Sequence, residues 1–252
     1  MTTVTSLNAD KLEQVPLHLI EQIEKPSVYS VLQSSTLLNA LTSEEIDKLA
    51  AVSRVVHVNR GDYIWLKGSD VDYFGLAATG FVKMVRSCAD GTDVTMELFG
   101  PSQLFGLCGT ICGMGCPLTA VAVTDLWYLR IPKRAFMEIY NTSPVLKDRM
   151  VRRLTLRLQN AHHMISSLSG GRVEERVAVV LFMLAESYGQ KEGKSIILRV
   201  PLTRQEISEM AGTTVESTIR TISRWQKDGL VSTDHHYIRI LEESGLREMI
   251  VH

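Results

Sequence analysis

A heptad pattern in the middle of the chain constrains the fold more than any other feature of the sequence. Between residues 151 and 168, apolar residues recur at alternating spacings of three and four, which is typical of a long helix with one apolar seam. A lone helix would leave this seam in water, so we expect a parallel homodimer; the alternative is that the seam packs only on its own chain. The seam residues are Val151, Leu154, Leu158, Ala161, Ile165 and Leu168.

The end of this helix and its outer positions can also be predicted from the sequence. Gly170 and the glycine that follows it end the helical pattern and are a candidate hinge. Charged and amide side chains are expected on the outer, solvated positions of the helix. These positions are Arg152, Arg153, Arg157 and Gln159.

The region before the long helix has a β-rich pattern. From Val55 to about Pro132, short runs that alternate apolar and polar residues are separated by glycines and by an Asp90–Gly91 turn, which indicates an antiparallel roll or barrel. Upstream, Thr42 and Glu45 have the spacing of a capping box and predict the start of a helix.

The region after the long helix predicts a winged helix-turn-helix. A helix from Val173 and a strand over residues 196–200 precede two short helices, of which the first begins at a Thr203–Glu206 capping box and ends at Gly212. A small hairpin over residues 231–240 follows. The apolar residues expected to face inward from the two short helices are Ile207, Met210, Ala211, Val215, Ile219, Ile222 and Trp225.

The second short helix carries a pair of residues suited to reading DNA bases. Glu216 and Arg220 are four positions apart, so they lie on one face, and their mutual attraction is expected to hold both in register. Arginine donates twice to guanine and glutamate accepts from cytosine. Phosphate contacts are expected from residues around this pair, and the whole candidate DNA-binding set is Thr203, Arg204, Gln205, Val215, Glu216, Ser217 and Arg220.

Composition narrows the function class. The net charge is −1, but residues 151–227 hold twelve basic and seven acidic side chains, which favours a polyanion-binding half. With 45% hydrophobic residues, no long apolar run and no signal segment, we expect a cytoplasmic protein with no membrane contact. Because no nucleophile–base arrangement, phosphate loop or His-metal motif is visible, we expect no catalytic residues and no enzyme; a thiol or metal enzyme built on the cysteines is the remote alternative.

Several motifs in order resemble the CRP/FNR family of regulators. The helix-turn-helix motif from Thr203 to Arg220 is similar to that of the family, and the spacing of Gly61, Ile64 and Gly68 is similar to its cyclic-nucleotide-binding-type β-roll. The resemblance implies an α+β fold with an N-terminal double-stranded β-helix (a jelly-roll-like β-roll) as sensor domain, a long dimerisation helix and a C-terminal winged helix-turn-helix domain. The implied boundaries are 1–30 for an N-terminal extension, 31–140, 141–170 and 171–252.

The same resemblance implies a homodimeric transcription regulator that binds a two-fold-symmetric site on double-stranded DNA, with RNA polymerase as a further partner. The family's base-reading Glu and Arg correspond to Glu216 and Arg220. Where the fumarate-nitrate branch has a base-contacting Ser, this chain has Ile219, so the operator of that branch cannot be assumed.

The segment that binds cyclic AMP in the family is altered here. Residues 107–120, which follow Gly106, include no acidic residue, and no arginine lies between Arg86 and Arg130. A bound phosphodiester would therefore be an uncompensated charge. We therefore do not expect cyclic AMP as the effector. In its place stand Cys108, Cys112 and Cys116, and the glycines among them favour a loop over a helix.

These cysteines predict a sensor whose chemistry the sequence leaves open. A [4Fe–4S] cluster would take Cys108, Cys112 and Cys116 as ligands, with Cys88 or an oxygen ligand as the fourth. The alternatives are zinc, a thiol switch, a haem or gas sensor, or cysteines that are plain core residues. A change at this segment is expected to alter how the roll packs on the long helix and so to reorient the DNA-binding domain.

Overall fold

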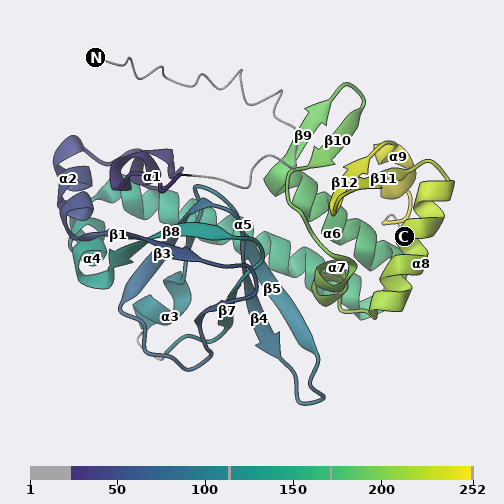
Figure 1. The fold of residues 1–252 in the computed structure, drawn as a ribbon, viewed down its shortest axis with the longest axis horizontal. Helices are drawn as coiled ribbons and strands as arrows, with labels where there is room; N and C mark the ends of the chain where they lie inside the picture. The colour runs from purple at the N-terminus through teal and green to yellow at the C-terminus, as the bar shows by residue number, and fades with distance from the viewer. Residues whose placement is uncertain (1–23, 113–114, 171, 251–252) are drawn as a thin grey trace.

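One long helix, α5 (Pro144–Gly170), joins an N-terminal β-structure to a C-terminal domain of helices and a small sheet (Figure 1). The computed structural model describes residues 24–112, 115–170 and 172–250, without the side chains of Cys108, Cys112, His163 and residues 167–170. The order of the elements confirms the predicted α+β fold, with a β-roll, a long helix and a helix-turn-helix domain.

The β-roll consists of antiparallel strands whose apolar faces meet. Among the described residues the strands form two four-stranded sheets, in the orders β1-β8-β3-β6 and β2-β7-β4-β5. Trp65 from one sheet stacks on Phe105 from the other, and Phe105 in turn packs against Tyr128, in one buried cluster. The strands are β1 (Arg54–Val58), β2 (Tyr63–Trp65), β3 (Tyr73–Thr79), β4 (Val82–Ser87), β5 (Asp93–Phe99), β6 (Leu104–Phe105), β7 (Thr119–Ala122) and β8 (Leu126–Pro132).

Helices α1 (Val28–Ser34), α2 (Ser43–Val52) and α4 (Lys133–Thr142) pack at the end of the roll where α5 begins. The predicted capping box at the start of α2 is confirmed: the Glu45 amide donates to the Thr42 hydroxyl, and the Glu45 carboxylate accepts from the Thr42 amide.

The short helix α3 (Leu107–Cys112) corrects the expectation of a loop for the first part of the cysteine segment, whereas residues 115–116 lie outside any helix, as expected. The chain is helical through Gly109 because this glycine lets α3 approach the following backbone. A Cβ added at Gly109 would lie 2.8 Å from the Cys116 Cα. Close packing of two backbone segments therefore outweighs the low helix propensity of glycine.

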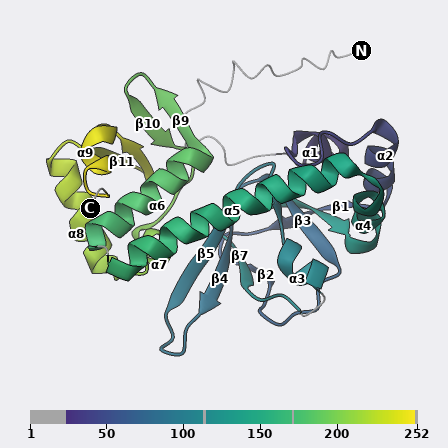
Figure 2. The same ribbon diagram turned by 180° about the vertical axis from the view of Figure 1, so that it is seen from behind.

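The apolar seam of α5 faces solvent. Val151 is 60% exposed, Leu154 43%, Leu158 56% and Ile165 60%, and Ala161 is also exposed; the Leu168 side chain lies outside the described residues. Figure 2 shows α5 crossing both domains with its outward face uncovered. This contradicts the alternative in which the seam packs on its own chain.

Two arginines of α5 that were expected on its solvated side face the β-roll. Arg153 is half-buried and donates to the Leu104 carbonyl, and Arg157 pairs with Glu97 of β5. They therefore tie the helix to the roll instead of facing solvent.

No helix in the described ranges is long and apolar enough to span a membrane.

The C-terminal domain has the predicted winged helix-turn-helix order. Its sheet also contains an unpredicted strand, β9, and has the order β11-β12-β10-β9 within the described residues. Ile207, Ile222 and Trp225 are completely buried, as predicted. The elements are α6 (Val173–Tyr188), β9 (Gly189–Glu192), β10 (Ser195–Leu198), α7 (Arg204–Ala211), α8 (Val215–Lys227), β11 (Val231–Asp234), β12 (Tyr237–Ile240) and α9 (Glu243–Arg247).

One inward-facing prediction in this domain is wrong. Ile219 is 44% exposed and lies outside the core cluster, whereas its neighbour Thr218 is fully buried. The β-branched Thr218 takes the inward position because its hydroxyl donates to the carbonyl of Thr214 and leaves only its methyl group for the core.

Candidate nucleic-acid interface

The starts of helices α7 and α8 are defined by side-chain caps, and the end of α7 is defined by one glycine. The Thr203 hydroxyl accepts from the Glu206 amide, and the Glu206 carboxylate accepts from the Thr203 amide, which confirms the predicted capping box. Gly212 has a φ of 57° and ends α7 in the left-handed conformation that glycine adopts at low cost. Thr214 then caps α8 through the Ser217 amide, so both helices have defined starts.

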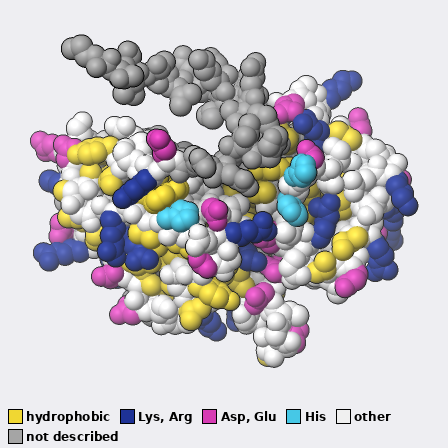
Figure 3. Space-filling view, viewed as in Figure 1, with side chains coloured by type: hydrophobic (Ala, Val, Ile, Leu, Met, Phe, Trp, Pro, Cys, Tyr) yellow, Lys and Arg dark blue, Asp and Glu magenta, His cyan; other side chains and the backbone are white. Residues whose placement is uncertain are grey.

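The outer face of α8 carries the predicted base-reading pair. Glu216 and Arg220 are both exposed and share this face. The expected ion pair between them is not among those of the described residues; the Arg220 guanidinium donates instead to the Ser217 hydroxyl, at 3.3 Å. Glu216 is therefore free to accept from a base without first breaking an internal bond. Figure 3 shows Lys and Arg side chains along the edge that α8 forms.

The other predicted contact residues have mixed environments. The hydroxyl of Thr203 is used by the helix cap, and Val215 is partly buried. The Gln205 amide donates to the Glu209 carboxylate at 3.1 Å. Arg204 is half-buried, and this burial lowers the pKa of its guanidinium, which nevertheless stays charged at neutral pH. At the start of α7, Arg204 is thus a cation suited to a phosphate contact.

The structure adds Arg224 to the interface. It lies one turn beyond Arg220 and lines the same groove, of about 340 Å³, between α6 and α8. Its guanidinium lies 3.3 Å from the Glu174 carboxylate at the start of α6. The spacing of 216, 220 and 224 was a signal for this residue in the sequence, but its partner on α6 was not visible there.

The inner side of α7 is docked on the β-roll. Lys83 Nζ of β4 lies 2.7 Å from the Glu209 carboxylate, and the Thr95 hydroxyl of β5 donates to that carboxylate at 3.0 Å. Lys83 is 15% and Glu209 8% exposed, so the pair is largely shielded from water. This contact could not be predicted from the sequence, because its partners are 126 residues apart.

A second contact between the roll and the C-terminal domain surrounds Tyr188 at the end of α6. Its hydroxyl donates to the Leu98 carbonyl at 2.9 Å, and its ring packs edge-on against Phe81. Burial raises the pKa of Tyr188, so the hydroxyl remains a donor at physiological pH. A Cβ at Gly100 would lie 2.7 Å from Phe81 and 2.8 Å from Tyr188, so only glycine permits this approach.

The cysteines fall in different environments. Cys116 is 3% exposed, its amide donates to the Ser69 carbonyl, and burial raises the pKa of its thiol. Cys88 is exposed at the end of β4, and the free end of the β4–β5 hairpin lies apart from α3 in Figures 1 and 2. The structure therefore does not bring Cys88 and Cys116 together. The described side chains include no cluster of three metal-binding residues, and those of Cys108 and Cys112 lie outside the description.

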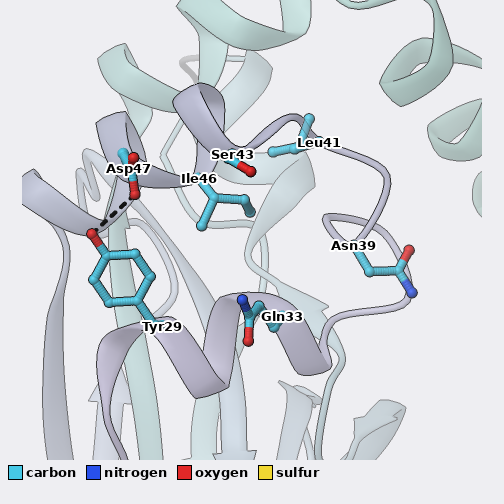
Figure 4. Close-up of a pocket in the computed structure, with 7 residues that line it drawn as sticks. All are labelled: Tyr29, Gln33, Asn39, Leu41, Ser43, Ile46 and Asp47. Carbon is cyan, nitrogen blue, oxygen red and sulfur yellow. Dashed lines mark hydrogen bonds between the residues drawn. The ribbon is translucent and has the colours of Figure 1, made fainter.

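A pocket of about 390 Å³ lies between α1 and α2, at the opposite end of the molecule from α8 (Figure 4). The Tyr29 hydroxyl donates to the Asp47 carboxylate at 3.0 Å across it. This hydrogen bond raises the pKa of Tyr29. The pocket is distant from the groove beside α8 and takes no part in the interface.

The β-roll and the C-terminal domain each match a known domain family. Residues 55–143 match the cyclic nucleotide-binding domain family, and residues 175–249 match the Crp-like helix-turn-helix domain family. The transcriptional activator protein FnrA of Stutzerimonas stutzeri is 25% identical over 208 residues, which are 82% of this chain and 85% of the relative.

Two further proteins show similarity over most of the chain. The CRP-like cAMP-activated global transcriptional regulator of Mycobacterium tuberculosis is 22% identical over 216 residues, covering 86% of this chain and 96% of the relative. The structure of FixK2 from Bradyrhizobium japonicum superposes with a TM-score of 0.70 at 18% identity, covering 80% of this chain and 98% of the other.

Proposed function

The chain belongs to the CRP/FNR family and is a DNA-binding transcription regulator of that type; from this premise we propose that two copies of it bind a two-fold-symmetric DNA site, under the control of a signal received by the β-roll. Base reading is assigned to Glu216 and Arg220 of α8. Recruitment of RNA polymerase to the bound site is part of the same proposal.

The DNA-reading role is supported by the burial of one face of α8 and the exposure of the other. One face of the helix is buried through Ile222 and Trp225, and the opposite face presents Glu216 and Arg220 to solvent. A carboxylate and a guanidinium one helical turn apart match the donors and acceptors of a G·C pair in the major groove. The helix starts at a capped end, so its first turns are rigid enough to enter the groove.

The exposed seam of α5 supports association of two copies. Val151, Leu154 and Leu158 leave an apolar stripe in water, and covering such a stripe with its own copy removes that area from both chains. A parallel arrangement places the two α8 helices on the same side of the dimer. Each then reads one half-site, with centres about 34 Å apart along the duplex.

Selection from random DNA, combined with mass measurement in solution, tests this proposal. We expect a dimer by light scattering and enrichment of an inverted repeat whose half-sites are one helical turn apart. Leu158→Glu should give a monomer that retains its fold but loses the selected site, and Arg152→Glu on the outer side of the same helix is the matched control. A monomeric wild type, or no enriched sequence, contradicts the proposal.

We infer that the signal reaches the DNA-binding domain through the contacts of the β-roll with α7. Glu209 on α7 is held by Lys83 and Thr95 of the β4–β5 hairpin, and Tyr188 is held by the backbone of β5. A shift of the hairpin would change the position of α7, and α8 follows because the two helices share one core. A signal that favours one hairpin position then shifts the population of DNA-binding dimers.

The cysteine segment is our proposed receiver of the signal. Cys108 and Cys112 occupy positions i and i+4 of α3, and the backbone of Cys116 lies against Gly109 of the same helix. Thiolates are the ligands of iron–sulfur clusters and of structural zinc. Because Cys88 is exposed on a separate hairpin, a [4Fe–4S] cluster or zinc ion at this segment would need a fourth ligand other than Cys88.

Anaerobic purification followed by iron, sulfide and zinc analysis tests the receiver. We expect bound iron and sulfide, lost in Cys112→Ser and retained in the control Cys88→Ser, together with a change in operator affinity on exposure to air. A metal-free wild type whose operator affinity is equal in air, under anaerobic conditions and after Cys112→Ser would contradict a sensing role for the segment.

A further inference from the structure

Ile219 is an unusual residue on the surface of the C-terminal domain. Among the described residues from 172 to 250, it is the only large hydrophobic side chain that is exposed, at 44%. It does not belong to the core cluster of this domain or to the apolar residues packed against that cluster. Its exposure is therefore not required by the folding of the domain.

The position of Ile219 relates it directly to the base-reading pair. At about 100° per residue, Ile219 lies about 60° from Glu216 around the helix, while Arg220 lies about 40° from Glu216 on the other side. Ser223, also exposed, falls between Ile219 and Glu216. The outer face of α8 therefore presents an apolar edge, a polar centre and a cationic edge.

The chemistry of the major groove offers one apolar partner for such an edge. The base edges there are hydrogen-bond donors and acceptors, except for the C5-methyl group of thymine. A branched aliphatic side chain cannot satisfy a donor or acceptor, but it can exclude water from a methyl group. The charged neighbour Glu216 argues against a protein partner, because glutamate is depleted at the centre of protein interfaces.

We propose that Ile219 reads the 5-methyl group of a thymine in each half-site, next to the base pair read by Glu216 and Arg220. This inference rests on the proposed function and adds a base preference to it. Ile219 is thus a specificity-determining residue of this chain, acting by apolar contact and not by hydrogen bonding.

Removal of single methyl groups from the DNA tests the inference. In the selected operator each thymine is replaced in turn by uracil, which lacks only the methyl group, and binding of the full-length protein is measured by fluorescence anisotropy. We expect one uracil position per half-site to weaken binding about fourfold, the effect of one methyl-sized apolar contact. With Ile219→Ala, the same replacement should have no effect.

Two controls separate a contact from a structural role. Ile222→Val shortens a buried residue of the same helix and should lower stability while keeping the uracil effect. Repeating the selection with Ile219→Ser should recover a site that no longer requires thymine at that position.

Three outcomes distinguish this inference from the proposed function. If a symmetric site is selected but no uracil position weakens binding, the thymine contact is excluded and the regulator role stands. If Ile219→Ala keeps the full uracil effect, another residue contacts the methyl group and the inference is wrong. If no site is selected at all, the proposed function and this inference fail together.

Discussion

The two helices of the helix-turn-helix differ in what holds them. Helix α7 is fastened to the β-roll by a shielded ion pair between Glu209 and Lys83, whereas α8 has its outer face in solvent and its inner face in the core of its own domain. The two helices are therefore expected to have different roles. Changes on α8 should alter which DNA sequence is bound, and changes on α7 should alter how the domain is held on the sensor.

The largest effect on DNA binding is expected at Arg220. Arg220→Ala should weaken operator binding about 10- to 100-fold and flatten the preference at one base pair per half-site, because a bidentate base contact is lost. Binding to a panel of single-base operator variants measures both effects. Lys227→Ala, at the end of the same helix, should leave the preference unchanged; equal weakening on all sequences would mean that Arg220 contacts only phosphate.

The ion pair on α7 should have its largest effect on stability. Lys83→Met should lower the free energy of unfolding by about 1–2 kcal/mol, because the shielded Glu209 carboxylate loses its cation while keeping Thr95 and Gln205 as donors. Urea denaturation measures this. The double variant with Glu209→Leu should recover much of the loss, and the selected DNA sequence should stay the same. A changed base preference would break the division between α7 and α8.

A smaller effect is expected from Arg204 at the outer end of α7. Arg204→Gln should weaken binding to operator and random DNA by a similar few-fold factor and reduce the slope of log affinity against log salt by about 1, since one phosphate contact is lost. Salt titrations of binding measure the slope. A loss confined to the operator would instead place Arg204 on a base.

The smallest effect is expected from Glu174, the partner of Arg224 across the groove beside α8. Glu174→Gln should raise DNA affinity about twofold at low salt, because it removes a negative charge near the phosphates and leaves the Arg224 guanidinium only its longer pair with Asp228, at 3.9 Å. The effect should vanish at high salt. In the double variant with Arg224→Gln the gain should be smaller, and an equal gain would exclude release of Arg224 as the cause.

Much of the C-terminal domain could be predicted because its signals are local. The Thr203–Glu206 capping box, Gly212 at the turn and the i,i+4 placement of Glu216 and Arg220 all act within one or two helical turns. The same holds for the capping box of α2. Their outcome depends on neighbouring residues and hardly on the rest of the fold.

The errors arise from contacts that the periodicity of the sequence does not describe. Gly109 lies within α3 because the backbone of Cys116 approaches it, and Arg153 turns inward because the Leu104 carbonyl needs a donor there. Thr218 faces inward and Ile219 outward because the Thr218 hydroxyl donates to the Thr214 carbonyl one turn earlier. Hydrophobic periodicity does not describe this interaction. Cys88 is a candidate fourth ligand by sequence, but Cys88 and Cys116 belong to different parts of the roll.

The order of the elements, the apolar seam of α5 and the pair of side chains on α8 could all be predicted, because periodicity and capping are short-range properties. Packing within the folded chain leaves the seam uncovered and holds α7 through Lys83 and Thr95, and neither feature can be seen in the sequence. These features depend on which distant surfaces meet, and the free energy of that packing is shared among residues far apart along the chain.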